Sequence, residues 1–268
     1  MRPKTGIWTR PKGAGGDGGA VELTGTGWAL LVTASALVGL AKGGLQMGTM
    51  LSVSLLSLVM SPVQAAGVLL PVYVVSDLFG LIAYRRHFDR RVLGRLLPAA
   101  LVGVVLGWAT ASLVEPRWIG GLVGVIGAAF AILTLLRPAP VDAPARSADW
   151  VKGSICGLVA GYTSFVSHTG APPYQIYVQP LQLRKEIYAG TVTVFFAIVN
   201  AVKLIPYAAL GQLGTENLTQ AAAMIPVTAL GVAAGVWLVR RIPQRGFYLF
   251  ITWTLLLVSL KLIWDALP

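Results

Sequence analysis

Residues 157–173, GLVAGYTSFVSHTGAPP, interrupt the second half of the chain with small residues, hydroxyls, a histidine and a Pro-Pro pair. Gly161 and Gly170 weaken a helix interior, and Pro172 removes a backbone donor and is followed by another proline. The apolar runs on either side of this stretch are each too short to cross a bilayer. The sequence therefore predicts two short helices separated by a break.

Residues 39–50, GLAKGGLQMGTM, have a similar character at the matching place in the first half of the chain. Here a lysine lies among glycines inside an apolar run. Non-helical backbone at membrane depth is tolerated only where protein or a water-filled cavity covers it. We therefore expect the two stretches to meet at the centre of a membrane transporter.

The composition is that of a membrane protein. Hydrophobic residues make up 56% of the chain, charged residues only 12%, and the mean hydropathy is +0.74. Charged residues are about a quarter of a soluble domain. Apolar runs long enough to span about 30 Å of hydrocarbon are residues 63–84, 96–114, 118–136, 187–207, 218–239 and 247–264. The sequence predicts an all-α polytopic membrane protein.

Several other functions are disfavoured. The net charge of +11 does not indicate nucleic-acid binding, because the basic residues lie mainly at the ends of apolar runs and in the N-terminal tail. The single cysteine, Cys156, excludes an intrachain disulfide and a CxxC site. Residues 13–18 match a dinucleotide-binding pattern, but no strand precedes them. Since no Walker A, HExxH, GxSxG or metal-ligand pattern occurs, we expect no enzyme activity, no cofactor and no metal.

An internal repeat divides the apolar part of the chain. Gly67, Pro71, Asp77 and Tyr84 align, at an offset of 123, with Gly190, Val194, Asn200 and Tyr207. Leu97, Pro98, Gly103 and Gly107 align, at an offset of 128, with Ile225, Pro226, Gly231 and Gly235. The sequence predicts a disordered tail at residues 1–26, a first membrane repeat at 27–137, a cytoplasmic linker at 138–150 and a second repeat at 151–268. A cleaved signal peptide is a less favoured interpretation of the basic tail and the apolar run after it.

Equivalent loops of the two repeats have opposite charge bias. Residues 85–95 carry five arginines and one aspartate, whereas residues 208–217 carry one glutamate and no basic residue. Residues 115–117 are balanced, whereas residues 240–245 carry three arginines. Basic loops stay in the cytoplasm, so the two repeats are predicted to have inverted topology.

Inversion requires each interrupted segment to begin and end on the same side of the membrane. We therefore expect each repeat to be a re-entrant helical hairpin followed by three full transmembrane helices. The predicted arms are residues 28–41 and 45–60 in the first hairpin, and 151–166 and 172–179 in the second. Both termini then lie outside the cytoplasm.

Two halves that each open with a glycine-rich hairpin leading to a proline resemble the sulfite exporter TauE/SafE family of bacterial permeases. The resemblance covers about residues 28–262. It implies a multi-pass protein of the bacterial inner membrane that transports a small sulfur-containing anion, such as sulfite, sulfoacetate or another organosulfonate, as an exporter. The first hairpin departs from the family in having Lys42 and only scattered glycines.

Candidate substrate-binding residues come from both hairpins and from one later helix. Free N–H groups at helix N-termini, hydroxyls and fixed positive charge all suit an oxyanion. The candidates are Lys42, Gly43, Gly44, Gln46, Ser164, Ser167, His168, Thr169, Gly170 and Asn200. For Lys42 a snorkelling role is the alternative, and for His168 a structural one.

Asp77 is the candidate coupling residue, because a carboxylate deep in an apolar run is costly and usually functional. An ion pair with a nearby arginine is the alternative. Its repeat partner Asn200 is also polar, so both are expected to face the protein interior. Lys203 and Lys261 are predicted to snorkel near helix ends.

The sequence thus favours a secondary transporter that works by alternating access, with a small anion and the lipid bilayer as its partners. No nucleic-acid partner is expected, and a homodimer is an open alternative to a monomer. A membrane-embedded accessory or assembly protein is the second hypothesis, with glycines that only pack helices closely. A channel is the third.

Overall fold

The computed structural model describes residues 25–45, 48–56, 58–59, 62–111, 113–136, 148–209 and 215–267. Within these residues every regular element is a helix. The predicted tail, except for residues 25–26, and most of the predicted linker lie outside the described residues.

The helices of the first half are α1 (Gly25–Leu40), the π-helical turn η1 (Ala41–Leu45), α2 (Gly48–Leu56), α3 (Pro62–Tyr84), α4 (Arg90–Thr110) and α5 (Pro116–Leu136). Those of the second half are α6 (Trp150–Ser167), α7 (Ala171–Val178), the 3₁₀ turn η2 (Gln179–Leu181), α8 (Lys185–Ala209), α9 (Thr215–Ala223), α10 (Ile225–Arg241) and α11 (Gln244–Ala266). Helices α4 and α6 each have an aspartate as the N-cap residue. The Asp89 side chain accepts from the backbone N–H groups of Arg91 and Val92, and the Asp149 side chain accepts from that of Lys152.

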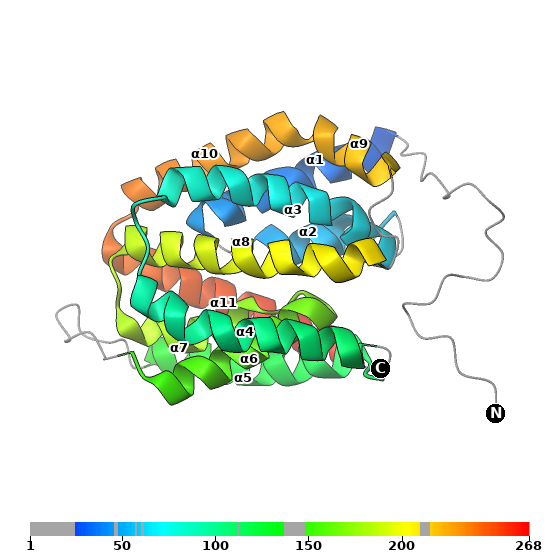
Figure 1. The fold of residues 1–268 in the computed structure, drawn as a ribbon. Helices are drawn as coiled ribbons and strands as arrows, with labels where there is room; N and C mark the ends of the chain where they lie inside the picture. Colours follow the sequence, from blue (N-terminus) through cyan, green and yellow to red (C-terminus); the bar gives the residue numbers. More distant parts are fainter. Residues whose placement is uncertain are drawn as a thin grey trace, which may run out of the picture.

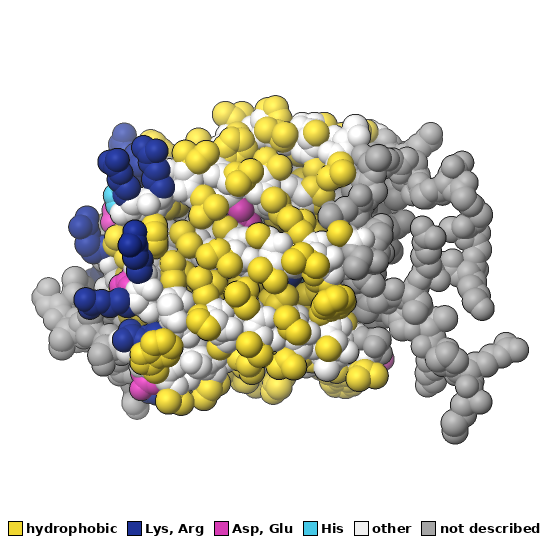
Figure 2. Space-filling model, viewed as in Figure 1, with side chains coloured by type: hydrophobic (Ala, Val, Ile, Leu, Met, Phe, Trp, Pro, Cys, Tyr) yellow, Lys and Arg dark blue, Asp and Glu magenta, His cyan; other side chains and the backbone are white. Residues whose placement is uncertain are grey.

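Among the described residues, five helical stretches are long and apolar enough to cross a membrane, namely Gly25–Leu45, Arg90–Thr110, Pro116–Leu136, Lys185–Pro206 and Gln244–Ala266. Apolar side chains cover most of the visible side of the molecule, while lysines and arginines gather at one end (Figure 2). An apolar flank with basic side chains gathered at one end suits a protein that spans a bilayer. The prediction of an all-α polytopic membrane protein is confirmed at this level.

Both predicted breaks are present. In the first half the break comes at Gly44, whose φ of 110° lies in the region that only glycine adopts without strain. In the second half it comes at His168, which has a φ of 56° and ends α6, before Pro172 and Pro173 start α7. The first arm is longer than expected: α1 and η1 together form a 21-residue stretch, since helical structure continues to Leu45.

The main contacts between helices of the two halves follow the repeat. When each helix is replaced by its equivalent in the other half, the same pairs of helices are in contact. Helix α3 packs on its equivalent α8, and α5 packs on its equivalent α11. Other contacts cross between the halves: α1 packs on α10 just as α6 packs on α4, and α10 contacts α3 just as α4 contacts α8. In Figure 1, α3 and α8 run in opposite directions, as do α4 and α10. Each half therefore supplies helices to both sides of the molecule.

Glycines make the two crossed contacts possible. A Cβ added at Gly39 of α1 would lie 2.5 Å from the Thr228 carbonyl of α10, and one added at Gly161 of α6 would overlap the Ala100 carbonyl of α4. Ala100 and Thr228 are related by the same offset of 128 that aligns the glycines of α4 and α10. Both interfaces thus bring backbone against backbone at corresponding positions, which is how small residues let membrane helices approach.

The basic loops lie at one end of the molecule. The α3–α4 and α10–α11 connections are at the left of Figure 1, where Figure 2 shows the cluster of lysine and arginine side chains. Lys185, at the start of α8, reaches this end and donates to the carbonyls of Arg240 (2.8 Å) and Ile242 (2.5 Å). Helix α8 ends at the opposite end (Figure 1). The loop predicted to face the other side, residues 208–217, begins there, and its residues 210–214 lie outside the described residues.

Candidate functional site

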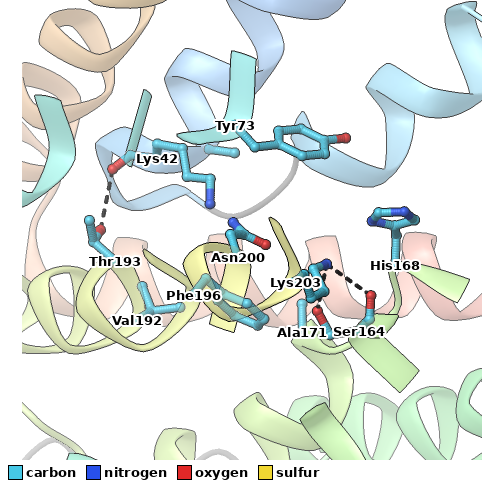
Figure 3. A pocket seen from close by; sticks show the side chains of 11 residues that line it. Lys42, Tyr73, Ser164, His168, Ala171, Val192, Thr193, Phe196, Asn200 and Lys203 are labelled. Carbon is cyan, nitrogen blue, oxygen red and sulfur yellow. Dashed lines mark hydrogen bonds between the residues drawn. The ribbon is translucent and has the colours of Figure 1, made fainter. Parts of the chain in front are cut away.

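A cavity lies between the two helix breaks and the paired helices α3 and α8 (Figure 3). The volume of the cavity, measured for the centres of water-sized spheres, is about 60 Å³. One water molecule needs only a fraction of that volume. The lining residues are Ala41, Lys42, Tyr73, Ser164, His168, Ala171, Val192, Thr193, Phe196, Asn200 and Lys203. The two breaks, far apart in the sequence, therefore contribute to one cavity, as predicted.

The η1 turn positions Lys42. Its own carbonyl accepts from Thr193 Oγ1 of α8 (3.2 Å), and the next carbonyl, that of Gly43, accepts from the Tyr84 hydroxyl of α3 (2.6 Å). Gly80 lets α3 come close, because a Cβ there would lie 3.0 Å from the Lys42 carbonyl. Lys42 is consequently 5% exposed, and its ammonium points toward α8 (Figure 3). The snorkelling alternative for this residue does not fit such a placement.

Lys42 forms a buried ion pair with the candidate coupling carboxylate. Its Nζ lies 2.6 Å from Asp77 Oδ1, while the Asn200 amide donates to Asp77 Oδ2 over 2.7 Å. Asp77 is 3% exposed and Asn200 5%. The expectation that these repeat-related residues both face the interior is confirmed, and they also contact each other. The alternative of an ion pair is present, but its cation is not an arginine: it is Lys42, which lies in the helix break at η1.

The α6–α7 break forms the opposite wall. The Thr163 hydroxyl donates to the Thr169 carbonyl (3.2 Å), and the Thr169 amide donates to the Thr163 carbonyl (3.1 Å). These bonds fix the turn that carries His168 into the cavity lining. The His168 ring lies 6.3 Å, centroid to centroid, from Tyr73 of α3. The Lys42 ammonium lies 5.9 Å from the same tyrosine ring, so Tyr73 bridges the two walls.

Lys203 of α8 is the site residue that sequence reasoning missed. It was expected to snorkel, yet it is 1% exposed. Its Nζ donates to the Ser164 carbonyl (3.0 Å) and lies 3.2 Å from the Ser164 hydroxyl. Among the described residues it forms no salt bridge with a carboxylate. The signal that could have found it is helical spacing, because Lys203 follows Asn200 by three positions and so shares its face.

The remaining candidates have other contacts. Gly43 packs against Val232 and Gly235 of α10, and Gly44 packs against Ala189 and Tyr84.

Within the second break, the Ser167 and Thr169 hydroxyls bond each other (2.7 Å), and Gly170 packs against Ala160 and Ser164. None of the candidate glycines, nor Ser167 or Thr169, lines the cavity. Their roles in binding stay predictions, and Gln46 lies outside the described residues.

The N-terminus of α7 offers fewer donors than expected. Ala171, its first residue, lines the cavity, but Pro172 and Pro173 have no backbone N–H. The Tyr174 amide is already bonded to the Gly170 carbonyl (3.3 Å). Positive charge near this wall therefore comes from the ammonium of Lys203, which reaches Ser164 of α6 from α8.

Broken helices that bring ionisable side chains together inside an apolar bundle are typical of membrane transporters. A sequence model described as sulfite exporter TauE/SafE matches residues 28–262, which is most of the chain. The chain therefore belongs to the TauE/SafE sulfite exporter family, and the resemblance found in its sequence is confirmed. Neither the curated proteins nor the solved structures compared with the chain gave a match.

Proposed function

We propose that this protein is a secondary carrier that exports a small sulfur-containing anion across the bacterial inner membrane by alternating access. The observation that carries the proposal is Lys203, a buried lysine that lines the cavity without a carboxylate partner among the described residues. A buried cation is costly unless something neutralises it. A bound anion would do so.

The opposite wall supports the same conclusion. Lys42 lines the cavity from η1, and its ammonium forms an ion pair with Asp77. An anion between the two walls would meet one ammonium from each, together with the Asn200 amide and the Ser164 hydroxyl. Hydrogen bonds to charged donors are the strong ones, and oxyanions of sulfur offer several acceptor oxygens.

Alternating access is supported by the packing. The exchanged contacts and the opposed directions of equivalent helices are those expected of inverted repeats, in which one half can adopt the arrangement of the other. Each break then ends one arm of a re-entrant hairpin. Asp77 would couple transport to a proton by exchanging its bond to Lys42 for a proton when the anion arrives.

Binding to purified protein tests the proposal. Sulfite, thiosulfate, methanesulfonate, sulfoacetate and acetate are titrated against the wild type and against Lys203→Gln. Loss of one charge-assisted hydrogen bond is worth roughly 1.5–3 kcal/mol, so the variant should bind the preferred anion about ten- to a hundredfold more weakly. Lys261→Gln is the matched control, because Lys261 lies in α11 and pairs with Asp265 (2.5 Å) away from the cavity.

The second candidate is a membrane-embedded accessory or assembly protein. The observation that favours it is the backbone contact at Gly39 and Gly161, which serves packing alone. Packing, however, requires no buried lysine in a cavity wall. If folded wild-type protein binds none of the five anions, the carrier proposal is abandoned and the accessory role is favoured.

A further inference from the structure

We infer that the cavity selects for singly charged anions, so that a monovalent sulfonate or hydrogensulfite binds in preference to a dianion such as sulfate or sulfoacetate. This inference rests on the proposed function and narrows its substrate class. The observation behind it is the balance of formal charges on the side chains that surround the cavity.

Each wall contributes to that balance. Helix η1 gives Lys42, α3 gives Asp77 and the phenol of Tyr73, and α8 gives Lys203. The α6–α7 break gives His168, which is counted as neutral, as is Tyr73. Two ammonium groups and one carboxylate leave one uncompensated positive charge.

A buried site is most stable when its charges cancel, because an uncompensated charge in a medium of low dielectric is costly. One monoanion cancels the excess charge of Lys203. A dianion replaces it with an excess negative charge and places that charge near Asp77, which pairs with Lys42 of the cavity wall. The first arrangement is neutral, whereas the second adds repulsion between anions.

The hydrogen-bond arrangement points the same way. An ammonium has three donors, and two donors of Lys203 face the carbonyl and hydroxyl of Ser164. Lys42 is engaged by Asp77, whose second oxygen is held by Asn200. Lys203 therefore keeps one donor that faces neither Ser164 atom, and it is the ammonium of the cavity that no described carboxylate compensates.

A pair of ligands with the same shape tests the inference in the wild-type protein. Methanesulfonate keeps one negative charge at all pH values of interest, whereas methylphosphonate loses its second proton near neutral pH. We expect similar affinities at about pH 6 and at least tenfold weaker binding of methylphosphonate than of methanesulfonate at about pH 9. The comparison at about pH 6, where both ligands are mainly monoanions, controls for any remaining difference in their shape.

A charge variant provides the second test. Asp77→Asn raises the formal charge of the cavity by one unit, so the preference for methanesulfonate over sulfate, expected to be at least tenfold in the wild type, should fall about tenfold or reverse. Asp265→Asn is the control, because it removes the same charge from an exposed pair with Lys261 and should leave the preference unchanged.

The outcomes are distinguishable. Equal affinity for methylphosphonate and methanesulfonate at about pH 9 would overturn the charge selection and leave the carrier intact. An unchanged ratio in folded Asp77→Asn would do the same, and if that variant fails to fold, the wild-type comparison decides. Absence of binding by every anion would instead overturn the proposed function.

Discussion

At the scale of single residues, the cavity depends on one ion pair and one lysine without a carboxylate partner among the described residues. Lys42 and Asp77 come from different helices and are each almost wholly buried, so neither can be hydrated if the other is removed. Removing one member of a buried pair typically costs about 3–5 kcal/mol. The pair is thus a structural element as well as a functional one.

A double-mutant cycle tests this pair. Lys42→Gln should lower the free energy of unfolding by about 3–5 kcal/mol, because it leaves Asp77 charged and buried. Adding Asp77→Asn should restore most of that loss, since an amide needs no counter-ion. Denaturant unfolding in detergent measures all four proteins. Additive losses would mean that the two side chains do not interact.

Coupling is tested at the same residue. If Asp77 takes up and releases a proton during the cycle, Asp77→Asn should still bind an anion, but transport into vesicles should no longer respond to a pH gradient. Asn200, at the equivalent position, shows that an amide fits such a site. A pH response equal to that of the wild type, in a well-folded variant, would leave Asp77 with the structural role only.

At the scale of helices, the α1–α10 and α4–α6 interfaces determine how closely the two halves approach. Gly161→Ala should destabilise the protein by about 1–3 kcal/mol, because its Cβ would overlap the Ala100 carbonyl. Gly39→Ala should cost a similar amount at Thr228. Thermal unfolding measures both variants.

Gly94→Ala is the matched control for these substitutions. Gly94 also lies inside a helix, α4, yet no atom lies within 4 Å of an added Cβ. Alanine should therefore be neutral or stabilising there, by up to about 1 kcal/mol. If all three variants behave alike, close backbone contact is not what the glycines provide.

Most of the arrangement of elements could be predicted from sequence, because it follows from local signals. Apolar runs located the helices, and glycine, proline and charge located the breaks and the basic loops. The combined length of α1 and η1 was harder to predict from the sequence. The earlier glycines remain helical, and only Gly44 has a backbone conformation that interrupts the helix. Helix pairs such as α1 with α10 depend on contacts between distant segments.

The site was predicted less completely for the same reason. Lys42, His168, Asn200 and Ser164 were found because unusual residues stand out in apolar runs. Lys203 was misjudged, since its distance from the helix end suggested snorkelling, whereas the side of the helix it occupies points inward. The cation that pairs with Asp77 lies on a different helix, and spacing along one helix carries no information about it.

At the scale of the whole molecule, the basic end predicts the orientation in the membrane. With Cys156 first replaced, a cysteine within residues 85–95 should be protected from an impermeant thiol reagent in intact cells. A cysteine within residues 208–217 should be labelled. Permeabilised cells provide the control, since both should then react. Equal labelling of the two cysteines in intact cells would contradict the inverted topology. It would also contradict alternating access by exchange between two inverted repeats.

The crossed packing of α1 on α10 also limits when this protein can fold. Helix α1 ends at Leu40, and its partner begins at Ile225. At about 5–20 residues per second, the ribosome needs roughly 10–40 s to make the chain between them. Throughout that interval the glycine face of α1 has no native neighbour and must be covered by lipid or by the insertion machinery. Helix α1 is therefore made early but reaches its contacts with α10 late.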